Sequence, residues 1–187
     1  MRVFYNLLFL LGIFSISVSV VSCSDNDKNR ESNPFALLMR GAYNGGMFIN
    51  ENVDGESVNA MVVDNMVSLQ GMPFFTVYEA LSGYISNSDA LQGIESLDYP
   101  VYFTPTFANE QNGDILMELD VDDIYFSTDD IPVLCLDIEP GSGRFYNSEK
   151  LMLFDIYINN IFYVINDENI PVEGFIPMQL TFELYKK

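Results

Sequence analysis

Carboxylates are the reactive side chains that this sequence supplies in quantity. The chain of 187 residues has 27 Asp and Glu against 8 Lys and Arg, lacks His and Trp, and carries a formal net charge of −19. Glycoside hydrolysis is the chemistry that two facing carboxylates would perform, one of them with a raised pKa. The densest group of acids consists of Asp120, Asp122, Asp123, Asp129 and Asp130.

The pattern around these acids favours a solvent-exposed face. Asp120 and Asp122 fall on the polar side of an alternating strand pattern, and Asp129 and Asp130 precede Pro132 in a turn. A weak cation site and a catalytic pair are the alternatives. We therefore name no catalytic residue, no metal and no cofactor for this chain.

Calcium is the cation that such oxygen ligands would suit. When Asp120 is taken as the first position of an EF-hand loop, Tyr125 replaces the required Gly and Ile131 replaces the terminal Glu. Any cation site here is consequently nonspecific.

Nucleophilic catalysis lacks its usual base, because a conventional triad needs a His that this chain does not contain. Ser142 lies in a Pro-Gly-Ser-Gly segment that predicts a turn at residues 140–143. Cys135 lies in the hydrophobic run 131–138, which predicts a buried structural thiol. Gly45 and Gly46 have no Lys nearby, so they predict a close backbone approach and no phosphate loop.

The first 22 residues read as an export signal, since Arg2 is their only charge and an apolar stretch follows it. The segment Val20-Val21-Ser22-Cys23 resembles the lipobox of bacterial lipoproteins. That resemblance makes Cys23 the lipidation site and the mature N-terminus, with an ordinary signal peptide or an uncleaved membrane anchor as alternatives. The acidic residues after Cys23 resemble the signal that sends Bacteroides-type lipoproteins to the cell surface. We expect a protein lipid-anchored in the bacterial outer membrane and surface-exposed.

One folded domain follows the signal. Residues 23–35 predict a flexible polar tether, and residues 36–187 predict a single β domain. A short helical turn at residues 34–39 is expected where the two meet. The chain is 49% hydrophobic and 14% aromatic, which is typical of a packed β-rich domain. No Lys or Arg occurs between Arg40 and Arg144. Nucleic-acid binding is excluded on this charge balance, and attraction to anionic lipid headgroups is expected to be weak.

Period-two alternation predicts an all-β fold of about seven or eight strands. Strand runs are expected at residues 42–50, 58–70, 100–108, 115–126, 131–138, 149–166 and 176–184. Hairpin turns are expected at 54–55 and 112–113, a β-bulge at 122–123 and a break at 159–160. Apolar residues at spacings of three and four predict one helical insertion near residues 74–94, which would plug one end. Because only one crossover helix is present, we expect a mostly antiparallel meander that closes into a barrel or a sandwich.

The alternation also predicts which side chains face inward. The expected inward sets are Tyr43, Met47 and Ile49; Met61, Val63, Val67 and Leu69; and Ile176, Met178, Leu180, Phe182 and Leu184. Two aromatic groups could stack on a sugar or line an apolar pocket, although core packing is the main expectation. They are Tyr99, Tyr102, Phe103, Tyr125 and Phe126, and Tyr157, Phe162 and Tyr163.

Cys23 with its acidic tail, the segment Gly41-Ala-Tyr-Asn-Gly45 and the step at Met72-Pro73 resemble Bacteroides-type lipoproteins of uncharacterised, calycin-like (lipocalin-like) domain families. The resemblance implies a small up-and-down barrel or half-open sandwich without catalytic residues. We predict a non-enzymatic, lipid-anchored envelope protein that binds a small apolar molecule, a glycan or an envelope partner. A structural or adhesive component that assembles through sheet edges is the alternative, and a carboxylate hydrolase is a third.

Overall fold

The computed structural model describes residues 34–187 except 51, 86–90, 92–93, 108–110 and 127–132. The predicted signal peptide, Cys23 and the tether up to residue 33 lie outside the described residues. Helix α1 (Pro34–Met39) is the helical turn that the sequence predicted from residue 34 to residue 39.

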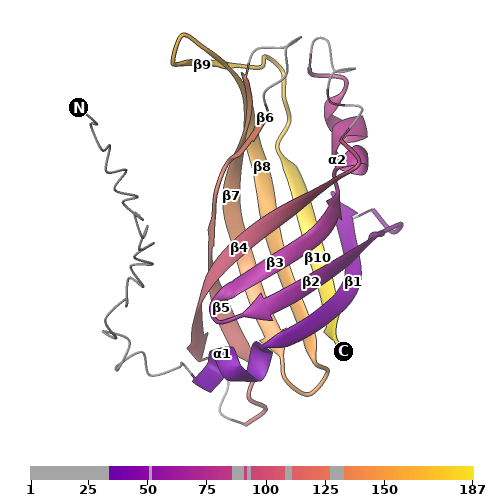
Figure 1. The fold of residues 1–187 in the computed structure, drawn as a ribbon, viewed down its shortest axis with the longest axis vertical. Coiled ribbons are helices and arrows are strands. Elements are labelled where there is room, and N and C mark those ends of the chain that lie inside the picture. The colour runs from indigo at the N-terminus through magenta and orange to yellow at the C-terminus, as the bar shows by residue number, and fades with distance from the viewer. Residues whose placement is uncertain (1–33, 51, 86–90, 92–93, 108–110, 127–132) are drawn as a thin grey trace, which may run out of the picture. The chain divides into compact units, whose positions relative to one another are not determined.

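Eight antiparallel strands close into a barrel (Figure 1). Each strand pairs with the one before it in the ring, and the first and last strands pair with each other. They are β1 (Gly41–Ile49), β2 (Glu56–Val63), β3 (Met66–Pro73), β4 (Ser96–Phe107), β5 (Ile115–Val121), β7 (Val133–Tyr146), β8 (Leu151–Ile165) and β10 (Met178–Lys186). The predicted antiparallel meander is confirmed, and the structure chooses the barrel over the sandwich.

Two short strands extend the barrel wall beyond one end. Strand β6 (Ile124–Phe126) pairs with β7, and β9 (Glu168–Pro171) pairs with β8. Because β7 and β8 also pair with each other there, β6, β9 and the adjoining segments 133–138 of β7 and 158–165 of β8 form a four-stranded sheet, which we call the extension (Figure 1). The predicted bulge at 122–123 is instead the gap where β5 ends and β6 begins farther along β7.

The interior of the barrel is filled by apolar side chains. Phe154 and Phe182 stack at 4.9 Å between ring centroids, and Phe145 is fully buried near them. Within the described residues, Asp114 is the one buried charged or polar residue, and it lies at the turn before β5. An eight-stranded barrel is just wide enough for side chains to fill it, so a packed interior is the expected result.

Short helices cover the two ends of the barrel. At one end, α1 buries Met39 and Ala36, and the Tyr43 hydroxyl donates to the Met39 carbonyl at 2.5 Å. At the other end, α2 (Phe74–Leu81) buries its apolar face, and the ring of Phe74 lies 4.6 Å from that of Phe126 in β6. The predicted plug is therefore present but shorter than expected, because α2 ends at Leu81.

The run 58–70 is two strands, and its predicted inward face is wrong in the first of them. A two-residue turn at Asp64 and Asn65, with Asp64 at φ +52°, joins β2 to β3. Val62 lies opposite Val67 in this hairpin, so the even-numbered residues of β2 face inward. Met61 and Val63 consequently face outward.

The predicted turn at residues 140–143 is also wrong, because β7 continues through it. The register moves from Pro140 opposite Ile156 to Gly143 opposite Phe154, which leaves one extra residue in β7 and makes a β-bulge. Strand β8 likewise continues through the predicted break, with Asn159 as the extra residue of a second bulge.

The last strand starts later than predicted. Ile176 is 69% exposed and precedes β10, whereas the other four expected inward residues are buried. Pro105 lies past Tyr102, where the pairing of β4 with β3 ends, so among the described strands β4 pairs only with β5 there. A proline is tolerated at such an edge because it has no amide hydrogen to donate.

Barrel closure depends on Gly45. This residue occupies the inward-facing place between Tyr43 and Met47, and a Cβ atom there would lie 1.8 Å from the Glu183 carbonyl oxygen of β10. No methyl group fits at that distance, so β1 and β10 approach closely only because residue 45 has no side chain.

Gly45→Ala should therefore lower the free energy of unfolding by about 1–3 kcal/mol, as forced overpacking does. Chemical denaturation followed by circular dichroism measures this change. Gly83→Ala is the matched control, since nothing lies within 4 Å of its added Cβ atom. Equal stability of the two variants would contradict the assigned role of Gly45.

Candidate functional site: an outer aromatic and amide face

The acids named from the sequence do not converge. Asp120, Asp122 and Asp123 are exposed, and Asp129 and Asp130 lie outside the described residues. Asp123 has a structural role, since its Oδ1 accepts a hydrogen bond from the Ile138 amide at 3.0 Å. Across the part of the chain that the structure describes, no group of three or more His, Cys, Asp or Glu is placed to hold a metal ion.

Ser142 and the glycines have packing roles. The Ser142 hydroxyl donates to Asp155 Oδ2 at 3.4 Å, and the other carboxylate oxygen of Asp155 accepts from Thr181 at 2.7 Å. A Cβ atom at Gly143 would lie 2.9 Å from the Cβ atom of Met117. These contacts join neighbouring strands, namely β7 to β8, β8 to β10, and β7 to β5.

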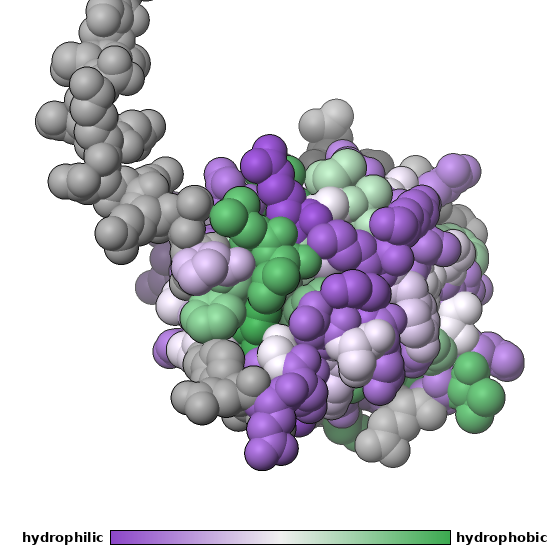
Figure 2. Space-filling view, turned by 90° about the horizontal axis from the view of Figure 1, so that it is seen from below, coloured by the Kyte–Doolittle hydropathy of each residue, from purple (hydrophilic) through white to green (hydrophobic). Residues whose placement is uncertain are grey.

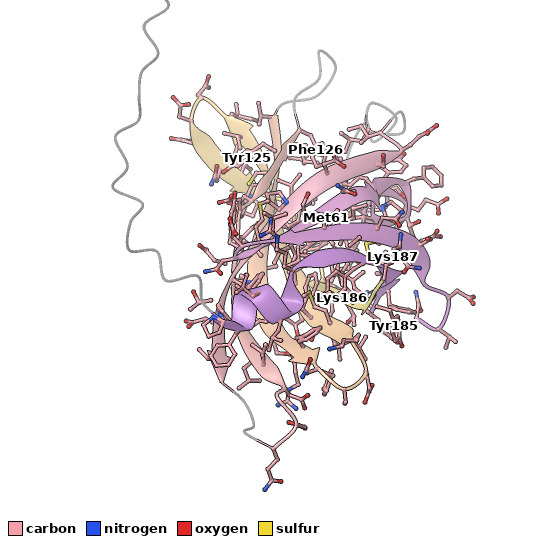
Figure 3. The ribbon with its side chains drawn as sticks, turned by 60° about the horizontal axis from the view of Figure 1, so that its bottom comes forward. Met61, Tyr125, Phe126, Tyr185, Lys186 and Lys187 are labelled. Carbon is pink, nitrogen blue, oxygen red and sulfur yellow. The ribbon has the colours of Figure 1, made fainter. Side chains whose placement is uncertain are left out.

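The first aromatic group is divided between the core and the surface. Tyr99, Phe103 and Phe126 are buried in the core. Burial, reinforced by the carboxylates of two nearby aspartates, raises the pKa of Tyr99 above its ordinary value. Tyr102 and Tyr125 are 43% and 61% exposed, on β4 and β6 respectively. Figure 3 places Tyr125 at the end of the molecule away from Tyr185 and Lys186.

Tyr125, Cys135 and Phe162 form a row across three neighbouring strands. Tyr125 lies opposite Cys135, which lies opposite Phe162. Leu134 and Leu136 belong to the core, so Cys135 between them points to the outer face of the extension. Cys135 is nevertheless only 2% exposed there.

The thiol of Cys135 is unsuited to nucleophilic attack. Burial raises its pKa, and the negative charges of Asp123 and Asp137 raise it further. The interaction with this thiol in turn raises the pKa of Tyr125. Cys135 therefore stays protonated near neutral pH, in agreement with the structural thiol expected from the sequence.

Amide–carboxylate pairs continue the row along β7 and β8. Asn160 Nδ2 donates to Asp137 Oδ2 at 3.3 Å, and Asn159 Nδ2 donates to Glu139 Oε1 at 3.0 Å. The bulge at Asn159 brings both amides beside these carboxylates. Because alternate residues share a face, Asn160 and Phe162 lie on the same side of β8.

We define the outer face as Tyr125, Cys135, Asp137, Asn160 and Phe162. It combines aromatic surface with hydrogen-bond donors and acceptors, which suits binding of a polar ligand that also has apolar patches. The sequence named Tyr125 and Phe162 in separate groups and treated Asn159 and Asn160 only as a break. Only the pairing of β6 with β7 and of β7 with β8 shows that these residues lie side by side.

Comparisons with protein-family models, with curated proteins and with solved structures give no match. In the described residues, none of the helices has the length and apolar character needed to cross a bilayer.

Removing the Tyr125 ring should expose the Cys135 thiol. We expect Tyr125→Ala to speed alkylation of Cys135 by iodoacetamide at mildly alkaline pH by about tenfold, because thiol reactivity depends on access and on thiolate formation. Mass spectrometry of the Cys135 peptide measures the rate. Tyr102→Ala, which removes an exposed ring from another face, should leave it unchanged. An unchanged rate in Tyr125→Ala would show that something else covers the thiol.

Proposed function

We propose that this protein is a non-enzymatic, lipid-anchored cell-envelope protein that binds a glycan on the outer face of its extension. The observation that supports this proposal is the row of Tyr125, Cys135 and Phe162 beside the Asn160–Asp137 pair. Sugar rings present apolar C–H faces and hydroxyl edges. An exposed aromatic ring beside amide and carboxylate groups complements both.

Binding outside the barrel is favoured over binding within it. A small apolar ligand would need interior space and an open mouth. Here large side chains occupy the interior, and α1 and α2 cover the two ends. We therefore place the binding surface on the extension.

Lipid attachment at Cys23 is supported by its sequence context, in which the segment Val20-Val21-Ser22-Cys23 resembles a lipobox. Burial of acyl chains in a bilayer contributes about 0.8 kcal/mol per CH₂ group, so two or more chains give stable anchoring.

Assembly through sheet edges is the second candidate function. Strands β6 and β9 each pair on one side within the described residues, so they are the available edges. Both are short, and β9 includes Glu168 and Pro171. Short edge strands with a charge and a proline resist the addition of another strand, which is why we rank glycan binding first.

Lipidation has a direct test in the native host. Growth with an alkyne-labelled fatty acid should label the wild-type protein, and Cys23→Ala should abolish the label because the thiol acceptor is lost. Gel fluorescence after click coupling measures the label. Ser24→Ala is the control and should remain labelled. Equal labelling of wild type and Cys23→Ala would contradict the lipoprotein assignment.

Glycan binding is tested with polysaccharide purified from the host envelope. Double substitution Tyr125→Ala/Phe162→Ala should weaken binding about tenfold or more, because each aromatic contact contributes about 0.5–1.5 kcal/mol. Biolayer interferometry on immobilised polysaccharide measures the affinity. Tyr102→Ala/Tyr185→Ala removes two exposed rings elsewhere and should bind as wild type does. Equal weakening in both doubles would exclude the outer face as the site.

A further inference from the structure

The cations of the folded domain gather at one end of the barrel. Every Lys and Arg in the described part of the chain lies toward the end that α1 covers. They are Arg40 after α1, Arg144 near the end of β7, Lys150 in the β7–β8 turn, and Lys186 and Lys187 at the C-terminus. This one-sided placement of the cations contrasts with the chain as a whole, which has a formal net charge of −19.

Lys186 is held against α1 by its side chain and joined to Lys150 through the backbone. Lys186 Nζ donates to the Leu38 carbonyl at 2.8 Å, and the Lys186 amide donates to the Lys150 carbonyl at 2.8 Å. Burial lowers the pKa of Lys186, and the positive charge of Lys150 lowers it further. Like charges held this close would be stabilised by an anion placed over them.

Two leucines project from the same end. Leu37 and Leu38 of α1 are 54% and 43% exposed, whereas Ala36 and Met39 on the other side of the helix are buried. Figure 2 looks onto this end and shows hydrophobic surface bordered by hydrophilic side chains. Exposed leucines next to Lys and Arg are typical of surfaces that lie in a membrane interface.

Among the described residues, the turns at this end contain three carboxylates, one of them buried and hydrogen-bonded. Asp114 is buried, with one oxygen accepting from the Asn147 amide at 3.1 Å and the other from Asn112 at 2.8 Å. Glu149 is adjacent to Lys150 in the β7–β8 turn, and Asp64 lies in the β2–β3 turn. At the far end, the connections and the extension contain carboxylates and no described Lys or Arg.

We propose that the α1 end docks on the lipid bilayer, with Leu37 and Leu38 among the headgroups and the five cations on lipid phosphates. This docking rests on the proposed lipid anchor. Residues 24–33 separate Cys23 from Pro34 and span at most about 40 Å when fully extended. This reach allows the α1 end to contact the bilayer, and in the docked state the extension, about 46 Å away along β7, points away from the membrane.

The absence of Trp from the chain allows a clean optical test. We introduce Leu38→Trp, and as its matched control Ile176→Trp at the far end, into full-length protein matured in its host. Each is reconstituted into phosphatidylcholine vesicles containing phosphatidylglycerol and brominated lipid. Leu38→Trp emission should shift to the blue and be quenched by bromine, and Ile176→Trp should remain unquenched.

Three measurements distinguish failure of the lipid docking from failure of the lipid anchor. Intact mass shows whether Cys23 carries acyl chains, and flotation shows whether the protein is anchored. Protein without acyl chains overturns the anchor and the docking together. Acylated protein that floats while Leu38→Trp stays unquenched overturns the docking alone. A blue shift without quenching means that protein, such as a second copy of the chain, covers α1, and it also overturns lipid docking.

Charge is tested separately from the leucines. Lys150→Gln/Lys187→Gln removes two exposed cations, and Asn52→Asp/Asn169→Asp changes the net charge equally at the far end. In the Leu38→Trp background, the first pair should reduce the ratio of docked to undocked protein by roughly fivefold per cation. The second pair should leave it unchanged. Equal effects of the two pairs would overturn the role of the cation cluster.

Discussion

Pairing of β1 with β10 is the constraint on which the rest of the structure depends. Seven residue pairs join the two strands, from Tyr43 opposite Lys186 to Ile49 opposite Leu180. Gly45 permits that contact because it places no side chain against the β10 backbone. Once the ring is closed, alternate residues of every barrel strand must face inward, and the eight barrel strands have no free edge along the ring. The apolar interior and the polar exterior follow from this closure.

The sequence predicts the architecture well where alternation is uninterrupted. Tyr43, Met47 and Ile49 in β1, and Leu180, Phe182 and Leu184 in β10, face the core as their spacing indicates. Prediction fails where one or two residues change the phase. Asp64 and Asn65 form a tight turn without the glycine that marks Asn112-Gly113, and the apolar residues on both sides suggested one strand.

Bulges are harder to predict because they depend on the partner strand. The segment at residues 140–143 has the composition of a turn, but Gly141 and Gly143 serve close packing against β8 and β5. Asn159 is an extra residue only in relation to Asp137 and Ile138 on the neighbouring strand. The outer face was missed for the same reason. Its members come from β6, β7 and β8, and only the register brings them together. The net charge led us to expect weak attraction to anionic lipid headgroups. A net charge contains no information on position, so it did not indicate that the five described cations lie at the α1 end.

The described chain enters the barrel beside α1 and leaves it at Lys187, so Pro34 and Lys187 lie toward the same end of the barrel, and the extension lies at the other. For a protein held at Cys23, a ligand on the extension would pull along the length of the barrel. The hydrogen bonds between β-strands run across the strands, so such a force loads many of them together in shear. The closed sheet has no seam to peel from one edge. The fold is thus suited to resist mechanical extension between the proposed anchor and a ligand on the extension.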